Sequence, residues 1–233
     1  MIMWPTTGPV SNARAPSKGL RHHPWVITVR PVLEIPSHGG FDLWPISDVE
    51  PYTFLALDGA LATDDVGTAV MALAVCNDID PGDDGPPRPN GPLGGFLHGL
   101  LTMDPLFAAG GLEVMDTVTG TRLLPGCCSG LEDRGDWWEV LDGDGSAAWF
   151  GHDPSPAAER HGSTVRLTVD SGADTSQWIN VPAAELRYLL AGAEKDLADF
   201  LDLATRWATG HLPEHSEHVG NALARALTLP PRN

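Results

Sequence analysis

The strongest hydrophobic pattern in this 233-residue chain is helical and lies near its C-terminal end. Between residues 182 and 209, apolar side chains recur at the 3.6-residue spacing of an α-helix, and Pro182 and Glu185 suit its first turn. These apolar positions are Leu186, Leu189, Leu190, Ala193, Leu197, Phe200, Leu201, Ala204 and Trp207. The opposite face carries Glu194, Lys195, Asp196, Asp199 and Asp202. The sequence therefore predicts one long amphipathic helix that ends at Gly210, and a weaker helix over residues 214–227.

Several short strands are predicted by runs that are rich in β-branched residues or that alternate between apolar and polar positions. They cover residues 25–35, 51–57, 147–150, 164–169 and 177–181, and residues 110–126 indicate two strands joined near Thr119 and Gly120. Pro31 has no N–H group, so it should place the second half of the first strand at a sheet edge or a break. Residues 37–45 and the Asp58-Gly59 pair indicate a loop and a turn.

Three segments between these strands carry helical patterns. Residues 66–76 are apolar almost all round, which fits either a buried helix that begins near Thr63 or a central strand. Residues 94–107 have a weaker helical pattern, interrupted at Asp104-Pro105 because the residue before a proline avoids helical geometry. Residues 133–141 predict a short helix.

The whole pattern predicts an α+β fold, in which an antiparallel or mixed sheet has the 182–209 helix packed on it. Residues 1–23 are polar and non-periodic and predict a flexible N-terminal tail. Residues 78–92 form the clearest loop. They separate an N-terminal α/β part (24–90) from a C-terminal α+β part (91–233), and we expect both parts to belong to one continuous domain.

The charge of the chain limits the kinds of partner that it can bind. The formal net charge is −17, and no acidic residue precedes Glu34. So acidic a surface repels phosphate backbones and anionic lipids, which disfavours nucleic-acid and membrane binding. It fits a basic protein partner, although excess acid also simply keeps a protein soluble. Three cysteines, two of them adjacent, make no disulfide framework, and no apolar run has the length of a signal-peptide core or a membrane span. We therefore expect a cytoplasmic protein.

The densest stretch of unusual residues is 126–156, which combines two cysteines, three tryptophans, a histidine and many acids. We take its acidic and aromatic side chains as candidate binding residues, with burial in the core as the alternative for the tryptophans. These candidates are Glu132, Asp136, Trp137, Trp138, Asp142, Asp144 and Trp149. Neighbouring residues on a helix point about 100° apart, so Trp137 and Trp138 cannot share one face.

The same stretch contains two candidate catalytic residues, Cys127 and Cys128, because a thiolate is a strong nucleophile. His152 with Asp153, Asp136 or Glu132 could complete a cysteine–histidine–acid arrangement. The alternative is two small thiols packed in a turn, and acidic neighbours would raise a thiol pKa rather than lower it.

A weak metal-site candidate is the C-terminal group His211, His215 and His218, for which a solvated polar helix start is the simpler explanation. No nucleotide-binding, serine-hydrolase or zinc-protease motif is present, and no cofactor is predicted.

Two segments, LPGCCSGLEDRGDWWEVLDG (residues 124–143) and WFGHDPSP (149–156), resemble a family of actinobacterial proteins that has no established activity, and the resemblance covers about residues 111–207. The chain departs from that family's Asp-Trp pair at residues 133–136. The order of strands and then a long helix is also similar to a class of immunity domains, which is an analogy of fold alone.

Together these observations predict an acidic cytoplasmic binding module, immunity-like or accessory, that holds a basic protein partner. The alternative is a small enzyme that uses Cys127 or Cys128 with His152.

Overall fold

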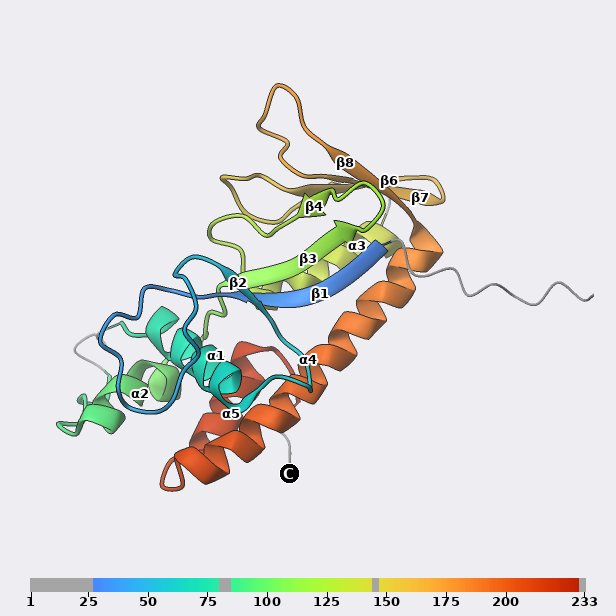
Figure 1. The fold of residues 1–233 in the computed structure, drawn as a ribbon. Coiled ribbons are helices and arrows are strands. Elements are labelled where there is room, and N and C mark those ends of the chain that lie inside the picture. Colours follow the sequence, from blue (N-terminus) through green and yellow to red (C-terminus); the bar gives the residue numbers. More distant parts are fainter. Residues whose placement is uncertain (1–26, 80–84, 144–146, 231–233) are drawn as a thin grey trace, which may run out of the picture.

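The long helix α4 (Ala183–His211) is the element around which the other elements are arranged (Figure 1). The computed structural model describes residues 27–79, 85–143 and 147–230, so the predicted tail 1–23 lies outside the described residues. Within those ranges the chain forms five α-helices and two four-stranded antiparallel sheets. The predicted α+β class and the long helix are confirmed, and the strands divide between two sheets.

The first sheet has the order β2-β1-β3-β4 and joins distant parts of the chain. Its strands are β1 (Ile27–Glu34), β2 (Phe54–Ala56), β3 (Gly110–Asp116) and β4 (Arg122–Leu123). β1 and β3 pair over seven positions, from Ile27 opposite Asp116 to Leu33 opposite Gly110. The residues before and after segment 78–92 therefore share one sheet.

The prediction that Pro31 puts the second half of β1 at an edge or a break is wrong, because that half is flanked by β2 and β3. The carbonyl of Pro31 accepts from the N–H of Leu57 at 2.9 Å, so Pro31 presents its backbone groups to the β2 side. β2 itself pairs only with Val32 to Glu34. The missing N–H of proline thus falls just beyond that ladder and interrupts no bond.

The second sheet has the order β5-β6-β7-β8. Its strands are β5 (Ala148–Trp149), β6 (Ala157–His161), β7 (Thr164–Thr168) and β8 (Trp178–Pro182). Strand β6 was not predicted, because its sequence AAERH lacks β-branched and large apolar residues. Five paired positions with β7 hold it in the sheet, so tertiary pairing overrides its weak propensity.

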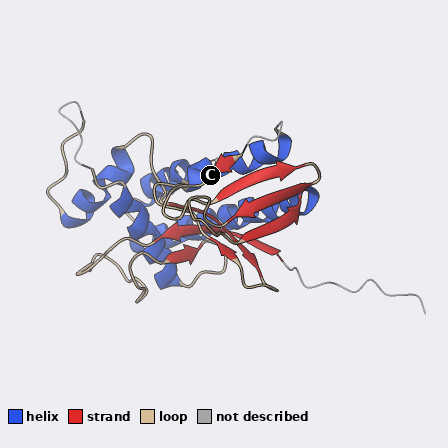
Figure 2. Ribbon diagram, turned by 90° about the horizontal axis from the view of Figure 1, so that it is seen from above, coloured by secondary structure: helices blue, strands red, loops and turns tan. Residues whose placement is uncertain are grey.

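In the described part of the chain, four further α-helices and one 3₁₀ turn complete the fold. They are α1 (Thr63–Cys76), α2 (Pro92–Thr102), the 3₁₀ turn η1 (Leu131–Arg134), α3 (Gly135–Asp142) and α5 (Ser216–Ala226). The helices α1, α2 and α5 cover the end of the molecule opposite the second sheet (Figures 1 and 2). The apolar segment 66–76 is therefore a buried helix and not a strand. Helix α4 continues through Gly210 to His211, one residue past its predicted end.

Two apolar cores lie along α4 and use different halves of it. Leu186, Leu190 and Ala193 pack with both sheets and α3. From Leu197 onward, the apolar face packs with α1, α2 and α5. In the same core, Trp207 contacts Trp44, from the loop before α1, with ring centroids 5.6 Å apart. α4 thus joins the cores. Among the described residues, no helix has the length and apolar character needed to cross a membrane.

Candidate functional site

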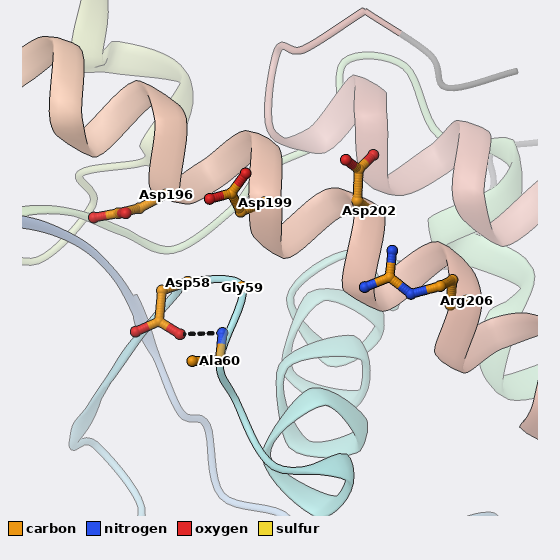
Figure 3. A pocket seen from close by; sticks show the side chains of 7 residues that line it. All are labelled: Asp58, Gly59, Ala60, Asp196, Asp199, Asp202 and Arg206. Carbon is orange, nitrogen blue, oxygen red and sulfur yellow. Dashed lines mark hydrogen bonds between the residues drawn. The ribbon is translucent and has the colours of Figure 1, made fainter.

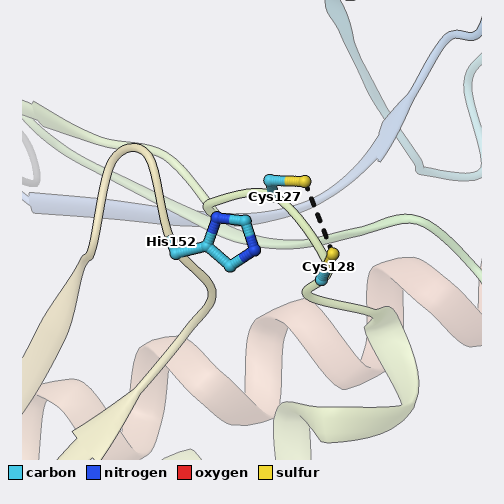
Figure 4. Close-up of side chains that lie close together, drawn as sticks. All are labelled: Cys127, Cys128 and His152. Atoms are coloured by element: carbon cyan, nitrogen blue, oxygen red, sulfur yellow. Dashed lines mark hydrogen bonds between the residues drawn. The ribbon is translucent and has the colours of Figure 1, made fainter.

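The two adjacent cysteines lie beside His152, on facing loops (Figure 4). A pair of backbone hydrogen bonds fixes this approach: the N–H of Cys127 donates to the carbonyl of His152 at 2.7 Å, and the N–H of His152 donates back at 3.1 Å. The sulfurs of Cys127 and Cys128 are 3.4 Å apart. One donor atom from each of the three residues lies within 4.8 Å of the others, and all three residues are exposed. The structure therefore brings together the predicted thiol and imidazole groups.

Two glycines allow the facing loops to approach so closely. A Cβ on Gly126 would lie 2.1 Å from the carbonyl oxygen of Pro154, and a Cβ on Gly151 would lie 2.6 Å from the backbone of Gly126. Gly151 also has φ of +102°, a backbone geometry that side chains with a Cβ rarely adopt. Cys128 itself has φ of +64°, which places its sulfur beside that of Cys127. The cluster is built by backbone packing.

The neighbouring sulfur changes the acidity of Cys127. The hydrogen bond with the thiol of Cys128, and then the charge that Cys128 would carry, raise the pKa of Cys127 above its ordinary value. A second thiolate so close repels the first, which disfavours ionisation. Because the thiolate is the nucleophile, this environment weakens Cys127 as an attacking group.

Asp153 stands next to the cluster rather than inside it. Its Oδ2 is 3.6 Å from Nδ1 of His152, and its side chain is 97% exposed. A carboxylate on the Nδ1 side leaves Nε2 of the imidazole for other contacts. Cysteine, histidine and acid are thus close together, and Asp153 lies outside the group formed by the other three residues.

A second candidate site is a groove between α4 and the turn at residues 58–60, with a volume of about 470 Å³ (Figure 3). We call it the acidic groove; its lining residues are Asp58, Gly59, Ala60, Asp196, Asp199, Asp202 and Arg206. Three of its carboxylates are spaced three residues apart on α4, and the turn that carries Asp58 passes beside the helix near Asp196 and Asp199. Gly59 approaches so closely that a Cβ there would lie 2.8 Å from Cβ of Asp199.

The carboxylates of the acidic groove change the acidity of Asp196, which is one of them. Partial burial, then repulsion from Asp58 and Asp199, raises the pKa of Asp196. Lys195 forms an ion pair with Asp199, and the Asp58 carboxylate accepts from the N–H of Ala60 at 2.7 Å. A cation in the groove would therefore relieve existing repulsion.

Half of this groove has no local signature in the sequence. The α4 carboxylates were recognised as one helix face, but Asp58 was interpreted only as a turn residue, and Arg206 was not considered. The two sides are more than 130 positions apart in the chain, so no local pattern links them. The run of acids on one helix face was the signal that the sequence offered.

Among the described residues, the candidate binding residues of segment 126–156 do not form one surface. Trp137 is 2% exposed and stacks on Phe150 with ring centroids 4.2 Å apart, so it belongs to the core and is not accessible to a partner. Trp138 is half-buried, with the Arg187 guanidinium 5.7 Å from its ring, and Asp142 forms an ion pair with the same arginine. The expectation that Trp137 and Trp138 face different surroundings is confirmed.

The remaining described candidates line two different cavities. Asp136 and the exposed Trp149 line a small cavity of about 260 Å³. Glu132 borders another cavity, of about 690 Å³, and burial raises the pKa of its carboxyl group. Asp144 lies outside the described residues.

The C-terminal histidines do not converge. Nδ1 of His211 lies 2.9 Å from the carbonyl oxygen of Trp207, and its ring stacks on the indole at 4.6 Å. His215 is the residue before the first turn of α5 and makes no side-chain capping hydrogen bond, and His218 is exposed on that helix. In the part of the chain that the structure describes, the three-donor group is the one at Cys127, Cys128 and His152.

Comparison with known proteins yields no relative, because no protein-family model, no curated protein and no solved structure matches the chain. The resemblance to an actinobacterial family therefore stays a prediction.

Proposed function

We propose that the protein is an acidic binding module, immunity-like or accessory, that holds a basic protein partner at the acidic groove in the cytoplasm. The observation that carries this proposal is the gathering of four aspartates, from α4 and from the turn at residues 58–60, around one groove (Figure 3). An arginine or lysine side chain that entered the groove would approach carboxylates from α4 and from the turn. The net charge of −17 would accelerate the encounter with a basic partner and would repel nucleic acids.

A direct test measures binding of a fluorescent arginine-rich peptide as a stand-in for the partner, at low and at high salt. Replacing Asp58, Asp196 and Asp199 together by asparagine should weaken binding about tenfold or more at low salt, and added salt should weaken wild-type binding. Asparagine keeps the shape of each side chain, so the change is one of charge.

The matched control removes three charges elsewhere, with Asp174→Asn, Glu214→Gln and Glu217→Gln, all at exposed positions. This variant has the same net charge and should bind almost as tightly as the wild type. Equal loss in both triple variants would attribute binding to overall charge, and binding that does not depend on salt would contradict the electrostatic proposal.

A second candidate function is a thiol-dependent enzyme, favoured by the two backbone hydrogen bonds that join Cys127 to His152. The raised pKa of Cys127 argues against it as an activated nucleophile. An enzyme of this kind needs a thiol that iodoacetamide alkylates at neutral pH faster than it alkylates a free cysteine. Alkylation of Cys127 and Cys128 that is no faster would exclude this function.

A further inference from the structure

We propose that Cys127, Cys128 and His152 bind one zinc ion, with a fourth coordination position open to solvent or to a ligand. The donor set is two thiols and one imidazole, and these groups already converge within 4.8 Å (Figure 4). Two cysteines and a histidine with an open fourth position make one of the ligand sets that zinc uses in proteins. The proposal does not depend on the acidic groove.

The sulfur–sulfur distance suits a single ion. Zinc–sulfur bonds are about 2.3 Å long, so two sulfurs on one zinc ion lie at most about 4.6 Å apart. The sulfurs of Cys127 and Cys128 are 3.4 Å apart, within that limit. Because the side chains are exposed, small χ1 rotations can open the sulfur–sulfur distance and close the distance to the imidazole without moving the core.

A divalent cation also offsets the repulsion that the two sulfurs acquire when they lose their protons. Two thiolates at this separation repel each other, and a doubly charged ion between them replaces that repulsion with attraction. On binding, each thiol loses its proton to solvent, and neutral His152 donates a lone pair. The step is a ligand exchange that releases two protons and needs neither an oxidant nor a reductant.

The surroundings of His152 match the outer sphere of a zinc site. A zinc-bound histidine usually directs its other ring nitrogen toward a carboxylate, carbonyl or water, which orients the ring. The Asp153 carboxylate lies on the Nδ1 side, 3.6 Å away, and so leaves Nε2 as the ligand atom. We assign Asp153 as a positioning residue, whereas the other three residues are ligands.

The backbone holds two of the donors in register before any metal arrives. The reciprocal bonds between Cys127 and His152 and the close contact of Gly126 with Gly151 fix the facing loops. Prior placement of the donors reduces the conformational entropy that metal binding must overcome.

The experiment titrates the reduced full-length protein with zinc by calorimetry, and with cobalt as a spectroscopic substitute. We expect one zinc per chain, a thiolate-to-cobalt charge-transfer band, and the intense visible bands of tetrahedral cobalt. Cys127→Ser, Cys128→Ser and His152→Asn should each weaken zinc binding about tenfold or more, while Asp153→Asn should weaken it by about tenfold at most and keep the charge-transfer band.

Matched controls change the same residue types elsewhere: Cys76→Ser for a thiol and His161→Asn for an exposed imidazole. Neither should alter zinc affinity. Zinc should also protect Cys127 and Cys128, but not Cys76, from alkylation in the wild-type protein, a readout that needs no variant.

Three results would overturn the proposal. The first is no stoichiometric zinc binding by the reduced protein at submillimolar zinc. The second is cobalt binding without a thiolate band. The third is zinc binding that survives all three ligand substitutions and is lost when His215 and His218 are replaced.

Discussion

At the scale of single residues, side-chain burial separates the tryptophans that stabilise the fold from those available to other molecules. Trp137 and Trp149 are twelve positions apart in the same segment, yet one is 2% exposed and the other 63% exposed. Their sequence contexts are alike, with acids and small residues nearby. The difference comes from α3, which turns Trp137 onto Phe150.

Replacing Trp137 with alanine should lower the free energy of unfolding by roughly 3–5 kcal/mol, because a large buried ring is lost and a cavity remains. Trp149→Ala, the matched control at an exposed site, should change it by less than about 0.5 kcal/mol. Urea unfolding followed by circular dichroism measures both. Similar losses in the two variants would mean that the indole of Trp137 is not a core side chain.

Gly126 provides a second prediction at this scale. Gly126→Ala would force a methyl group against the Pro154 carbonyl, so the facing loops should separate. We expect lower stability by about 1–3 kcal/mol and weaker zinc binding, although no ligand has changed. Gly39→Ala is the control, since a Cβ there meets nothing within 4 Å. Unchanged zinc affinity in Gly126→Ala would show that the loop contact does not support the cluster.

At the scale of elements, repulsion among acidic side chains on the polar face of α4 lowers the stability of the folded state at neutral pH. Its Asp196 carboxylate has a raised pKa, from partial burial and from the acids around it. Such a group favours the folded state only when protonated, so it adds stability below its ordinary pKa of 3.8 and loses that contribution as the pH rises through the higher folded value. At neutral pH the ionised Asp196 is therefore mildly unfavourable.

Asp196→Asn should consequently raise the urea midpoint at neutral pH, by a change worth about 0.5 kcal/mol or less because the site is partly exposed and screened. The gain should shrink with added salt and vanish below pH 3.8. Asp174→Asn, at an exposed loop position, should show no gain. A loss of stability in Asp196→Asn at neutral pH would contradict the assigned repulsion.

How well the sequence predicted each element depended on whether its pattern was local. The α4 periodicity extends over eight turns, so its core residues, from Leu186 to Trp207, were identified almost completely. Strand β6 has no such pattern and exists because β7 pairs with it. The thiol–imidazole cluster was predicted because Cys127 and His152 lie only 25 positions apart, whereas the acidic groove depends on a contact that only the fold creates.

At the scale of the whole molecule, α4 makes the two apolar cores parts of one structure. Leu190 lies in the core with the sheets, and Leu201 lies in the core with the other helices. Both belong to one continuous helix, about 43 Å long at 1.5 Å per residue. Loss of packing at either end should therefore be transmitted along a rigid element.

Leu190→Ala and Leu201→Ala should each lower stability by about 2–5 kcal/mol and accelerate amide hydrogen exchange in both cores by a similar factor. Tyr188→Ala, on the exposed side of the same helix, is the control and should leave exchange almost unchanged. Hydrogen-exchange mass spectrometry resolves the two regions. Faster exchange confined to the mutated core would show that the cores open independently.

The pairing of β1 with β3 sets the order in which the molecule can assemble during translation. Ile27 leaves the ribosome long before Asp116, its partner in the sheet, and β1 also contacts α4, which is synthesised later still. The growing polypeptide therefore carries β1 without its β3 partner until about half of the chain has been synthesised. Folding finishes only after Trp207 has emerged, so a ribosome that stalls before Ala183 should leave an aggregation-prone fragment that depends on chaperones.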